Sequence, residues 1–242
     1  RLEKKRKMIL ERGDDPFKVR AGCGKGNVYF CTLATKITVL LVNKIASLDP
    51  EGVGIEMEAD KPGWCDALNG LPGLLGSSIN ESAETGRLAR IFRDVLDRFA
   101  PEDAAVSLPE EAACFYAEVR ELLRHPAGDY EYWDRSSGAR ETYRKKVLFG
   151  VTGREVAVSA DDLKDFLSAV VAKVERGLSK AVDPRTGVYV TYFIHEVTQY
   201  DVLRDGQGAV VKNGDGFPCV RALAFRPRPL PLFLEGPVHV LR

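Results

Sequence analysis

The chain of 242 residues has no net charge, because its 35 lysines and arginines balance 35 aspartates and glutamates. Without an excess of one sign, no long-range field would hold it on nucleic acid or on an anionic membrane. It also shows neither an apolar secretory leader nor a run of about 20 apolar residues that could cross a bilayer. We therefore expect no nucleic-acid partner and no membrane partner.

Cysteine and histidine are scarce and scattered. The five cysteines are odd in number, no C-x-x-C pair is present, and the three histidines lie far apart in the sequence. Such spacing argues against a zinc site, a redox pair or a disulfide framework. We therefore expect no metal, idle or buried thiols, and a cytoplasmic location.

Helical periodicity dominates the first three quarters of the chain. Residues 28–48 are apolar on nearly every side; their β-branched content would also suit a central strand, but their length favours a buried helix. Apolar residues recur at helical spacing in three other expected helices, at residues 80–100, 109–125 and 160–181. Residues 130–148 are aromatic and charged and are also expected to be helical. Pro109 suits a first helical position, Ser159 suits a cap, and Gly138 is expected to interrupt or bend its helix.

The pattern changes beyond residue 183. Residues 186–203 are rich in β-branched and aromatic side chains, and "RDGQG" and "KNGDG" supply turn residues. This composition predicts strands or extended loops inserted into a helical scaffold. We expect a single domain over 1–242, helical over 1–182 and β-rich over 186–242, and both ends look like internal parts of a longer polypeptide.

Glycine and proline interrupt the segment "ADKPGWCDALNGLPGLLGSS", which carries a tryptophan and an acid in close succession. An indole face can stack on a sugar ring, and a nearby carboxyl can protonate a leaving-group oxygen. The residues alone also permit a structural interpretation, with Trp64 in the core, Asp66 as a helix cap and Asn69 in a turn. Both interpretations stay open on this evidence.

"WCDALNG", residues 64–70, resembles the W-N-D-G-M-N catalytic segment of the cellobiose-phosphorylase-type glycoside phosphorylases, among whose relatives are 1,2-β-oligoglucan phosphorylases. The resemblance covers residues 52–91, where "NESAETGRL" is similar to the family's glutamate-rich helix start. Cys65 and Ala67 depart from the family pattern, and residues 61–63 are additional. The resemblance implies a mainly α fold, part of an (α/α)6 toroid of helical hairpins with a short β or extended insertion near the C-terminus.

The resemblance also implies site residues. Asp66 would be the catalytic proton donor, and Trp64, Asn69 and Asp60 would bind the sugar. An inverting phosphorylase needs one protein carboxyl because phosphate attacks the anomeric carbon, whereas an inverting hydrolase needs a second carboxylate about 6.5–9.5 Å away. Candidates for a second carboxylate are Asp60, Glu81 and Glu84, although the two glutamates also suit the N-terminal end of their own helix.

Cationic residues in two places are candidates for binding the substrate or phosphate. "RAGCGKGN", residues 20–27, sets Arg20 and Lys25 among three glycines whose amides could cradle an anion or a sugar hydroxyl, with a plain flexible turn as the alternative. The family binds phosphate through histidines near its C-terminal part, which makes His239 the candidate here. His195 is expected to be a strand-face histidine beside Glu196.

The sequence thus predicts a carbohydrate-active enzyme that cleaves a β-glucosidic bond by inverting phosphorolysis and releases α-glucose 1-phosphate. Its partners would be a β-gluco-oligosaccharide and inorganic phosphate as co-substrate, with no other cofactor, and a homodimer is left open. The alternatives are a glycoside hydrolase or transglycosylase on the same toroid, or a non-catalytic sugar-binding fragment.

Overall fold

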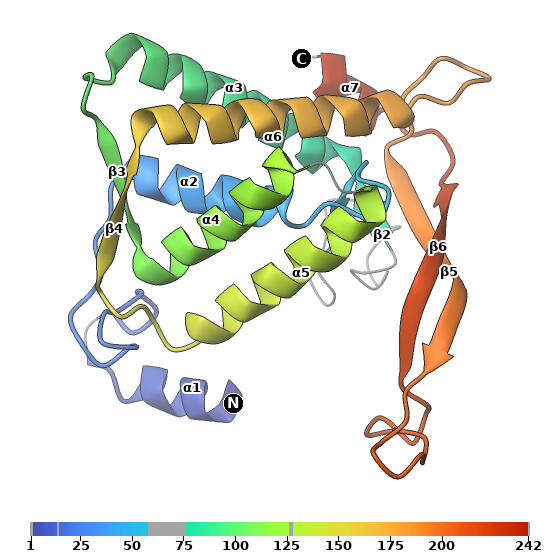
Figure 1. Cartoon of the computed structure of the whole chain (residues 1–242), viewed down its shortest axis with the longest axis horizontal. Helices are drawn as coiled ribbons and strands as arrows, with labels where there is room; N and C mark the ends of the chain where they lie inside the picture. The colour runs from blue at the N-terminus through green and yellow to red at the C-terminus, as the bar shows by residue number, and fades with distance from the viewer. Residues whose placement is uncertain (1, 14, 58–75, 126–127, 242) are drawn as a thin grey trace.

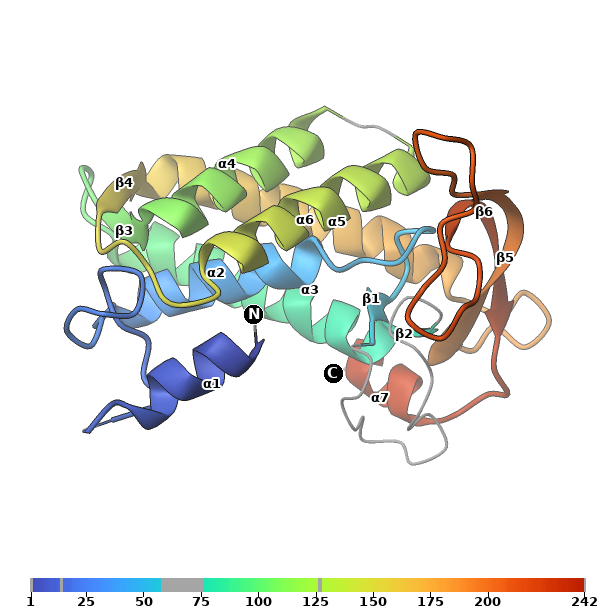
Figure 2. The same cartoon turned by 90° about the horizontal axis from the view of Figure 1, so that it is seen from below.

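The protein is a mixed structure of helices and antiparallel sheets (Figure 1). The computed structural model describes residues 2–13, 15–57, 76–125 and 128–241. Within these ranges, helices account for 47% of the residues and strands for 21%. The helices gather in one body, and a long two-stranded arm extends from one end of it (Figures 1 and 2).

The expectation of a mainly α toroid is wrong. The strands form a four-stranded sheet in the order β1-β2-β5-β6 and a two-stranded sheet of β3 and β4, so sheet pairing joins segments that a ring of helical hairpins would connect by loops. The physical reason is that short β-branched stretches between the helices pair with each other. The toroid was implied by the resemblance of residues 52–91, and the periodicity of the helices carries no information on these pairings.

Helices α2 to α6 fall close to their predicted positions, whereas α7 lies within residues 186–242, which were expected to be β-rich. The helix bounds within the described residues are α1 Leu2–Leu10, α2 Leu33–Ile45, α3 Ile79–Phe99, α4 Glu110–Arg124, α5 Asp129–Lys146, α6 Ala160–Lys180 and α7 Glu235–Leu241. Pro109 is the N-cap residue of α4, and the Ser159 hydroxyl caps α6 by accepting from the amide of Asp162. The expected interruption at Gly138 is wrong, since α5 runs through it without a break.

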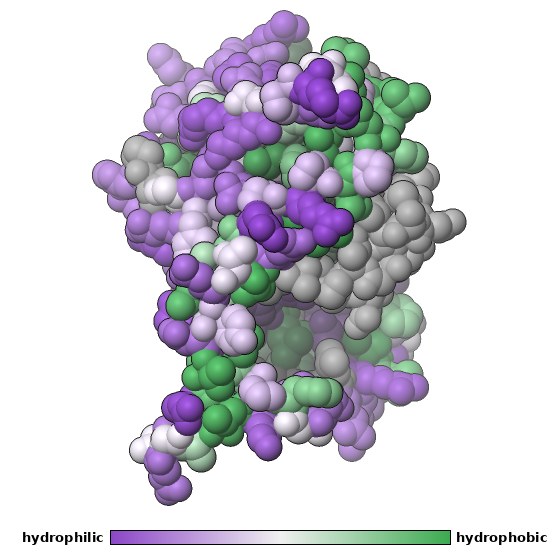
Figure 3. All heavy atoms as spheres, turned by 90° about the vertical axis from the view of Figure 1, so that its right-hand side faces the viewer, coloured by the Kyte–Doolittle hydropathy of each residue, from purple (hydrophilic) through white to green (hydrophobic). Residues whose placement is uncertain are grey.

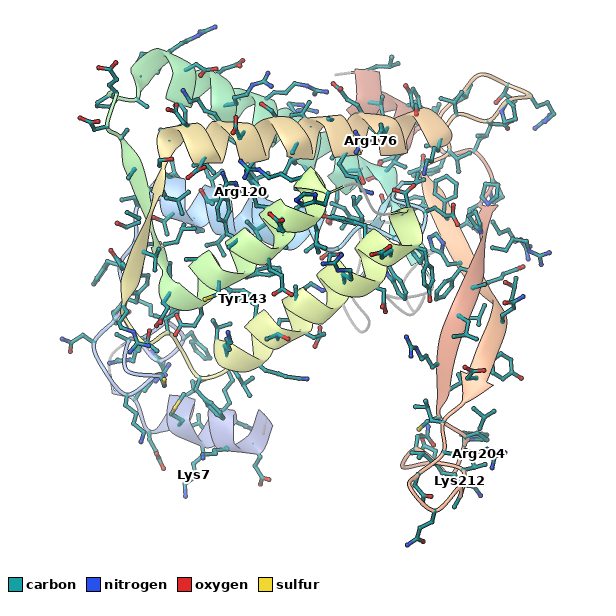
Figure 4. All side chains as sticks on the ribbon, in the orientation of Figure 1. Lys7, Arg120, Tyr143, Arg176, Arg204 and Lys212 are labelled. Atoms are coloured by element: carbon teal, nitrogen blue, oxygen red, sulfur yellow. The ribbon has the colours of Figure 1, made fainter. Side chains whose placement is uncertain are left out.

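The four-stranded sheet carries the arm. β1 (Ile55–Glu56), β2 (Gly76–Ser78), β5 (Tyr192–Val202) and β6 (Val220–Pro229) pair antiparallel in that order. Only the first three residues of β5 pair with β2, so the rest of β5 and its partner β6 project away from the body as the arm. Arg204 and Lys212 mark its tip (Figure 4).

The second sheet was not predicted. β3 (Ala105–Pro109) and β4 (Glu155–Ser159) pair antiparallel in full register from Ala105↔Ser159 to Pro109↔Glu155. Each strand leads directly into a helix, β3 into α4 and β4 into α6. Because the strands are antiparallel, α4 and α6 start at opposite ends of this two-stranded ladder, which lies at the end of the body away from the arm (Figure 1).

The core lies between the five helices α2 to α6. Its largest fully buried side chains include Leu41, Ile45, Phe166 and Leu167, contributed by α2 and α6. Tyr143 of α5 lies against α4, where its ring stacks on Phe115 with centroids 4.9 Å apart (Figure 4).

Two glycines let helices pack closely. A Cβ at Gly86 on α3 would lie 3.0 Å from Val174 Cγ1 of α6, and one at Gly177 on α6 would lie 2.1 Å from the Gly52 carbonyl oxygen. The missing Cβ at Gly86 therefore lets α3 pack closely against α6. The missing Cβ at Gly177 lets α6 contact the turn that precedes β1. Among the helices of the described ranges, none is long and apolar enough to cross a membrane.

Candidate functional site

A groove lies where α3, α6 and α7 meet. It has a volume of about 350 Å³, and cavities of about 300–1,000 Å³ are typical of small-molecule sites. Apolar side chains from the three helices form part of its wall, and its polar lining consists of Arg87, Arg90, Glu175, Ser179, Tyr189 and His239. The groove thus offers hydrogen-bonding groups of both signs on an apolar base.

Glu84 contacts two of the charged side chains that line this groove, Arg87 and His239. One of its oxygens, Oε1, lies 2.6 Å from a guanidinium nitrogen of Arg87 and 2.7 Å from Nδ1 of His239. Arg90 makes a parallel ion pair with Glu175 at 2.8 Å. A guanidinium has five N–H donors, and each of these ion pairs shows a single nitrogen–oxygen contact. Arg87 and Arg90 therefore retain donors for a ligand with acceptor oxygens.

His239, the predicted phosphate-binding residue, lies in this groove. It projects from α7, a helix of seven residues that packs against α3 at the arm end of the body (Figure 1). Arg87 and Arg90 were not predicted as site residues. The signal that could have found them is the spacing of three residues on α3, which puts both side chains on one face together with Glu84.

The glycine-rich stretch of residues 20–27 lies at the opposite end of the body, beside the loop that joins α5 to β4 (Figures 1 and 2). The amides of Gly22 and Cys23 donate to the carbonyls of Thr152 and Val151, and those of Gly24 and Gly26 donate to Ala21. These amides are therefore engaged within the fold and form no anion cradle. The predicted binding roles of the Arg20 and Lys25 side chains stay predictions, at a place far from His239.

The remaining predicted site residues, Asp60, Trp64, Asp66 and Asn69, lie outside the described residues. Of the other candidate carboxylates, Glu81 forms an ion pair with Lys44, and Glu84 contacts Arg87 and His239, which line the groove. Neither contact tests whether a second carboxylate takes part in catalysis.

A buried polar cluster of Asp49, Ser77 and His195 was not predicted. The Ser77 hydroxyl donates to Asp49 Oδ2 at 2.7 Å, and His195 Nε2 lies 3.1 Å from that hydroxyl and 3.3 Å from Asp49 Oδ2. Burial alone would raise the pKa of Asp49, but the hydrogen bond and charge of His195, with the Val53 amide and the Ser77 hydroxyl, hold it below its ordinary value.

This cluster is not a nucleophilic triad. The serine hydroxyl donates directly to the carboxylate, the histidine meets both partners through the same nitrogen, and the side chains of Asp49 and His195 are 0% and 1% exposed. A catalytic serine instead needs a histidine between itself and the acid, and an open face for its substrate. His195 does lie on a strand as expected, but the neighbouring Glu196 pairs with Arg226 and Arg228 of β6 rather than with the histidine.

Glu56 forms a second buried polar contact beside the first. It accepts from Nε1 of Trp133 at 2.7 Å and from the Arg140 guanidinium at 3.2 Å. Burial raises the pKa of Glu56, and the hydrogen bonds from Trp133 and Arg140 offset this only in part. No local pattern predicts this contact, because Trp133 and Arg140 lie on α5, about 80 residues after Glu56.

No family model and no curated protein matches this chain. The likeness to cellobiose-phosphorylase-type enzymes therefore stays a prediction from residues 52–91. Among the described residues, no group of three or more histidine, cysteine or acidic side chains is placed to hold a metal ion. The groove of α3, α6 and α7, with Arg87, Arg90 and His239, is the site whose chemistry the structure defines best.

Proposed function

We propose that this chain takes part in inverting phosphorolysis of a β-glucosidic bond, with the groove between α3, α6 and α7 holding the inorganic phosphate. The observation that carries the proposal is that His239, the residue expected to bind phosphate, shares one groove with Arg87 and Arg90. The proposal does not include a toroidal fold.

The groove suits phosphate on chemical grounds. Charge-assisted hydrogen bonds from guanidinium groups to phosphate oxygens are among the strongest in proteins, and the flat array of guanidinium donors favours binding through two oxygens. Phosphate would compete with Glu84 for Arg87 and His239, because all three side chains meet at one Glu84 oxygen. We expect the occupied groove to have Glu84 turned toward solvent, where its side chain is already 41% exposed.

The reaction needs one acid from the protein. Asp66 would donate its proton to the glycosidic oxygen while a phosphate oxygen forms a bond to the anomeric carbon from the opposite face. The carbon–oxygen bond to the leaving sugar breaks with its electron pair on the protonated oxygen. A β-glucoside thereby yields α-glucose 1-phosphate and a shortened acceptor, and Asp66 recovers a proton from solvent.

The test is to incubate the chain with β-1,2-, β-1,3- and β-1,4-linked gluco-oligosaccharides, with and without inorganic phosphate. We expect α-glucose 1-phosphate only when phosphate is present, and Asp66→Asn to lower its rate of formation by about 10²–10⁴-fold. Release of reducing sugar at the same rate without phosphate would contradict phosphorolysis and indicate hydrolysis. No product from any linkage would contradict catalysis by this chain.

A further inference from the structure

The two short strands β1 and β2 bracket residues 58–75, the segment to which Asp66 belongs. Their register pairs Ile55 with Ser78 and Glu56 with Ser77, and the Met57 amide donates to the Gly76 carbonyl at 3.0 Å. The last described residue before the segment is therefore bonded to the first one after it.

Glu56 and Ser77 are opposite each other in this antiparallel pair, so their side chains leave the same face of the sheet. Both side chains take part in buried polar contacts. Glu56 binds Trp133 and Arg140 of α5, and Ser77 binds Asp49 and His195. No hydrogen bond between described residues joins the two contacts directly, so they form a network only through this one cross-strand pair.

The same network also contacts the end of α2 and the turn that precedes β1. Arg140 also donates to Ser47 Oγ at 2.6 Å, just beyond the end of α2. Asp49 accepts from the amides of Val53 at 2.9 Å and Gly54 at 2.8 Å, in the turn that leads into β1. α5, the end of α2, this turn and β5 therefore all hold the same pair of residues.

Such a network is costly, because buried charges lose their hydration and are tolerated only when they are paired and hydrogen-bonded. Strands of two and three residues have too few ladder hydrogen bonds to be stable as a pair on their own. The side-chain contacts of Glu56 and Ser77 therefore add to the ladder, to the bond from the Glu56 amide to the Ser47 carbonyl at 2.8 Å and to the pairing of β2 with β5 in holding β1 against β2.

We infer that Glu56 and Ser77 are positioning residues, which hold β1 and β2, the strands on either side of residues 58–75, in place on the helical body. The consequence for catalysis rests on the proposed function, because it requires Asp66 to act as the acid. A displacement of about 1 Å at a reacting group can cost about 10²-fold in rate. Weakening the side-chain contacts of Glu56 or Ser77 should therefore lower kcat for phosphorolysis while leaving KM nearly unchanged.

The kinetic test compares Glu56→Gln and Ser77→Ala with matched controls, Glu131→Gln and Ser168→Ala, which alter exposed residues of α5 and α6. We expect kcat for phosphorolysis to fall by about 10–100-fold in the first pair, with KM within about twofold of the starting protein. The controls should keep both constants. A kcat unchanged in both Glu56→Gln and Ser77→Ala overturns the inference, and thermal melts show which variants are folded at the assay temperature.

Hydrogen exchange tests the positioning without any need for activity. The Met57 amide, bonded to Gly76, should exchange at least about tenfold faster in both variants, because local opening becomes easier, whereas the Val170 amide in α6 should keep its protection. Unchanged exchange at Met57 overturns the inference even if kcat falls. If Met57 exchanges faster but Asp66→Asn keeps full activity, the positioning stands and the proposed role of Asp66 is wrong.

Discussion

Asp49 is a single buried carboxylate that joins a turn, a strand and the arm. It accepts from the amides of the turn and from Ser77, and it contacts His195 at 3.3 Å. Asparagine keeps one acceptor oxygen but replaces the other with an NH2 donor, so part of this set of donors is left in a low-dielectric interior without an acceptor. Asp49→Asn should therefore lower the free energy of unfolding by about 3 kcal/mol, as loss of one partner from a buried pair does.

The measurement for Asp49→Asn is urea unfolding, with Asp205→Asn as the matched control. Asp205 makes the same type of turn, accepting from the amides of Gln207 and Ala209, but in the exposed tip of the arm. Its substitution should cost less than about 1 kcal/mol. Equal losses of unfolding free energy in the two variants would show that neither burial nor the contact with His195 adds to the stability that the turn itself provides.

The lowered pKa of Asp49 also predicts how stability changes in acid. A carboxyl whose pKa in the folded protein lies below its ordinary value of 3.8 stabilises the fold fully at higher pH. That contribution is lost as the pH falls below the ordinary value and through the pKa of the folded state. The difference in unfolding free energy between the starting protein and Asp49→Asn should therefore shrink on going from pH 7 to pH 3; a constant difference would contradict this.

At the residue scale, the sequence predicted what local chemistry determines. The Ser159 cap is confirmed, because capping depends on adjacent residues. His239 was chosen from the resemblance; the structure places it in the groove, and its phosphate role stays a prediction. Asp49 and Glu56 could not be found in this way, because their partners come from β2, β5 and α5. Their importance depends on tertiary contacts that no local pattern encodes.

Two helical glycines give opposite predictions at the element scale. Gly138 in α5 has open space where a Cβ would stand, whereas a Cβ at Gly177 in α6 would collide with the Gly52 carbonyl oxygen. Gly138→Ala should raise the free energy of unfolding by about 0.5–1 kcal/mol through helix propensity. Gly177→Ala should lower it by about 2 kcal/mol or more, because the backbone contact cannot relax cheaply.

Chemical denaturation of the two glycine variants is a direct comparison, since both exchange glycine for alanine inside a helix. A destabilised Gly138→Ala would mean that α5 is held in a conformation that needs glycine. A neutral Gly177→Ala would mean that α6 does not rest on the turn before β1.

The arm is joined to the body through an aromatic contact on one side of β6. Phe225 meets Trp133 edge to face at 5.2 Å between centroids and lies 6.2 Å from Tyr130. Farther along, the arm carries exposed apolar side chains such as Tyr200, Phe217 and Val220, and apolar atoms gather there (Figure 3). The root of the arm is therefore packed and its outer part is not.

Phe225→Ala should loosen the arm and lower the free energy of unfolding by about 2 kcal/mol, less than a fully buried phenylalanine would cost. Tyr200, whose side chain is 60% exposed, serves as the control, and Tyr200→Ala should change it by less than about 0.5 kcal/mol. Urea unfolding and the rate of proteolysis within residues 203–219 measure the two effects. Equal protease resistance of the two variants would contradict anchoring by Phe225.

Helices α3, α4 and α6 were the elements that the sequence could predict best, because each has an apolar stripe long enough to be seen without its partners. α5 is mostly polar and charged and has no such stripe. β3 and β4, at five residues each, also carry no such signal, and their pairing joins residues about 50 positions apart. The toroid was expected from the resemblance of residues 52–91, and helices joined by connections of unknown pairing did not argue against it.

At the scale of the whole molecule, the two predicted sets of cationic residues lie at opposite ends of the body. Arg20 and Lys25 are beside the β3–β4 end, and His239 is beside the arm, with Arg87 and Arg90 (Figure 1). The two ends differ in the groups that they offer to an anion. The amides of the glycine-rich stretch already donate to backbone carbonyls, whereas the groove is lined by cationic and other polar side chains. They cannot both contact one phosphate ion.

The most direct measurement is calorimetric titration of inorganic phosphate into the chain and into variants altered at each end. If phosphate binds in the groove, Arg87→Gln and His239→Gln should each weaken binding by about tenfold or more, as loss of a charge-assisted hydrogen bond does. Lys25→Gln should leave the affinity within about twofold. Loss of affinity in Lys25→Gln with full binding in Arg87→Gln and His239→Gln would contradict the groove as the phosphate site.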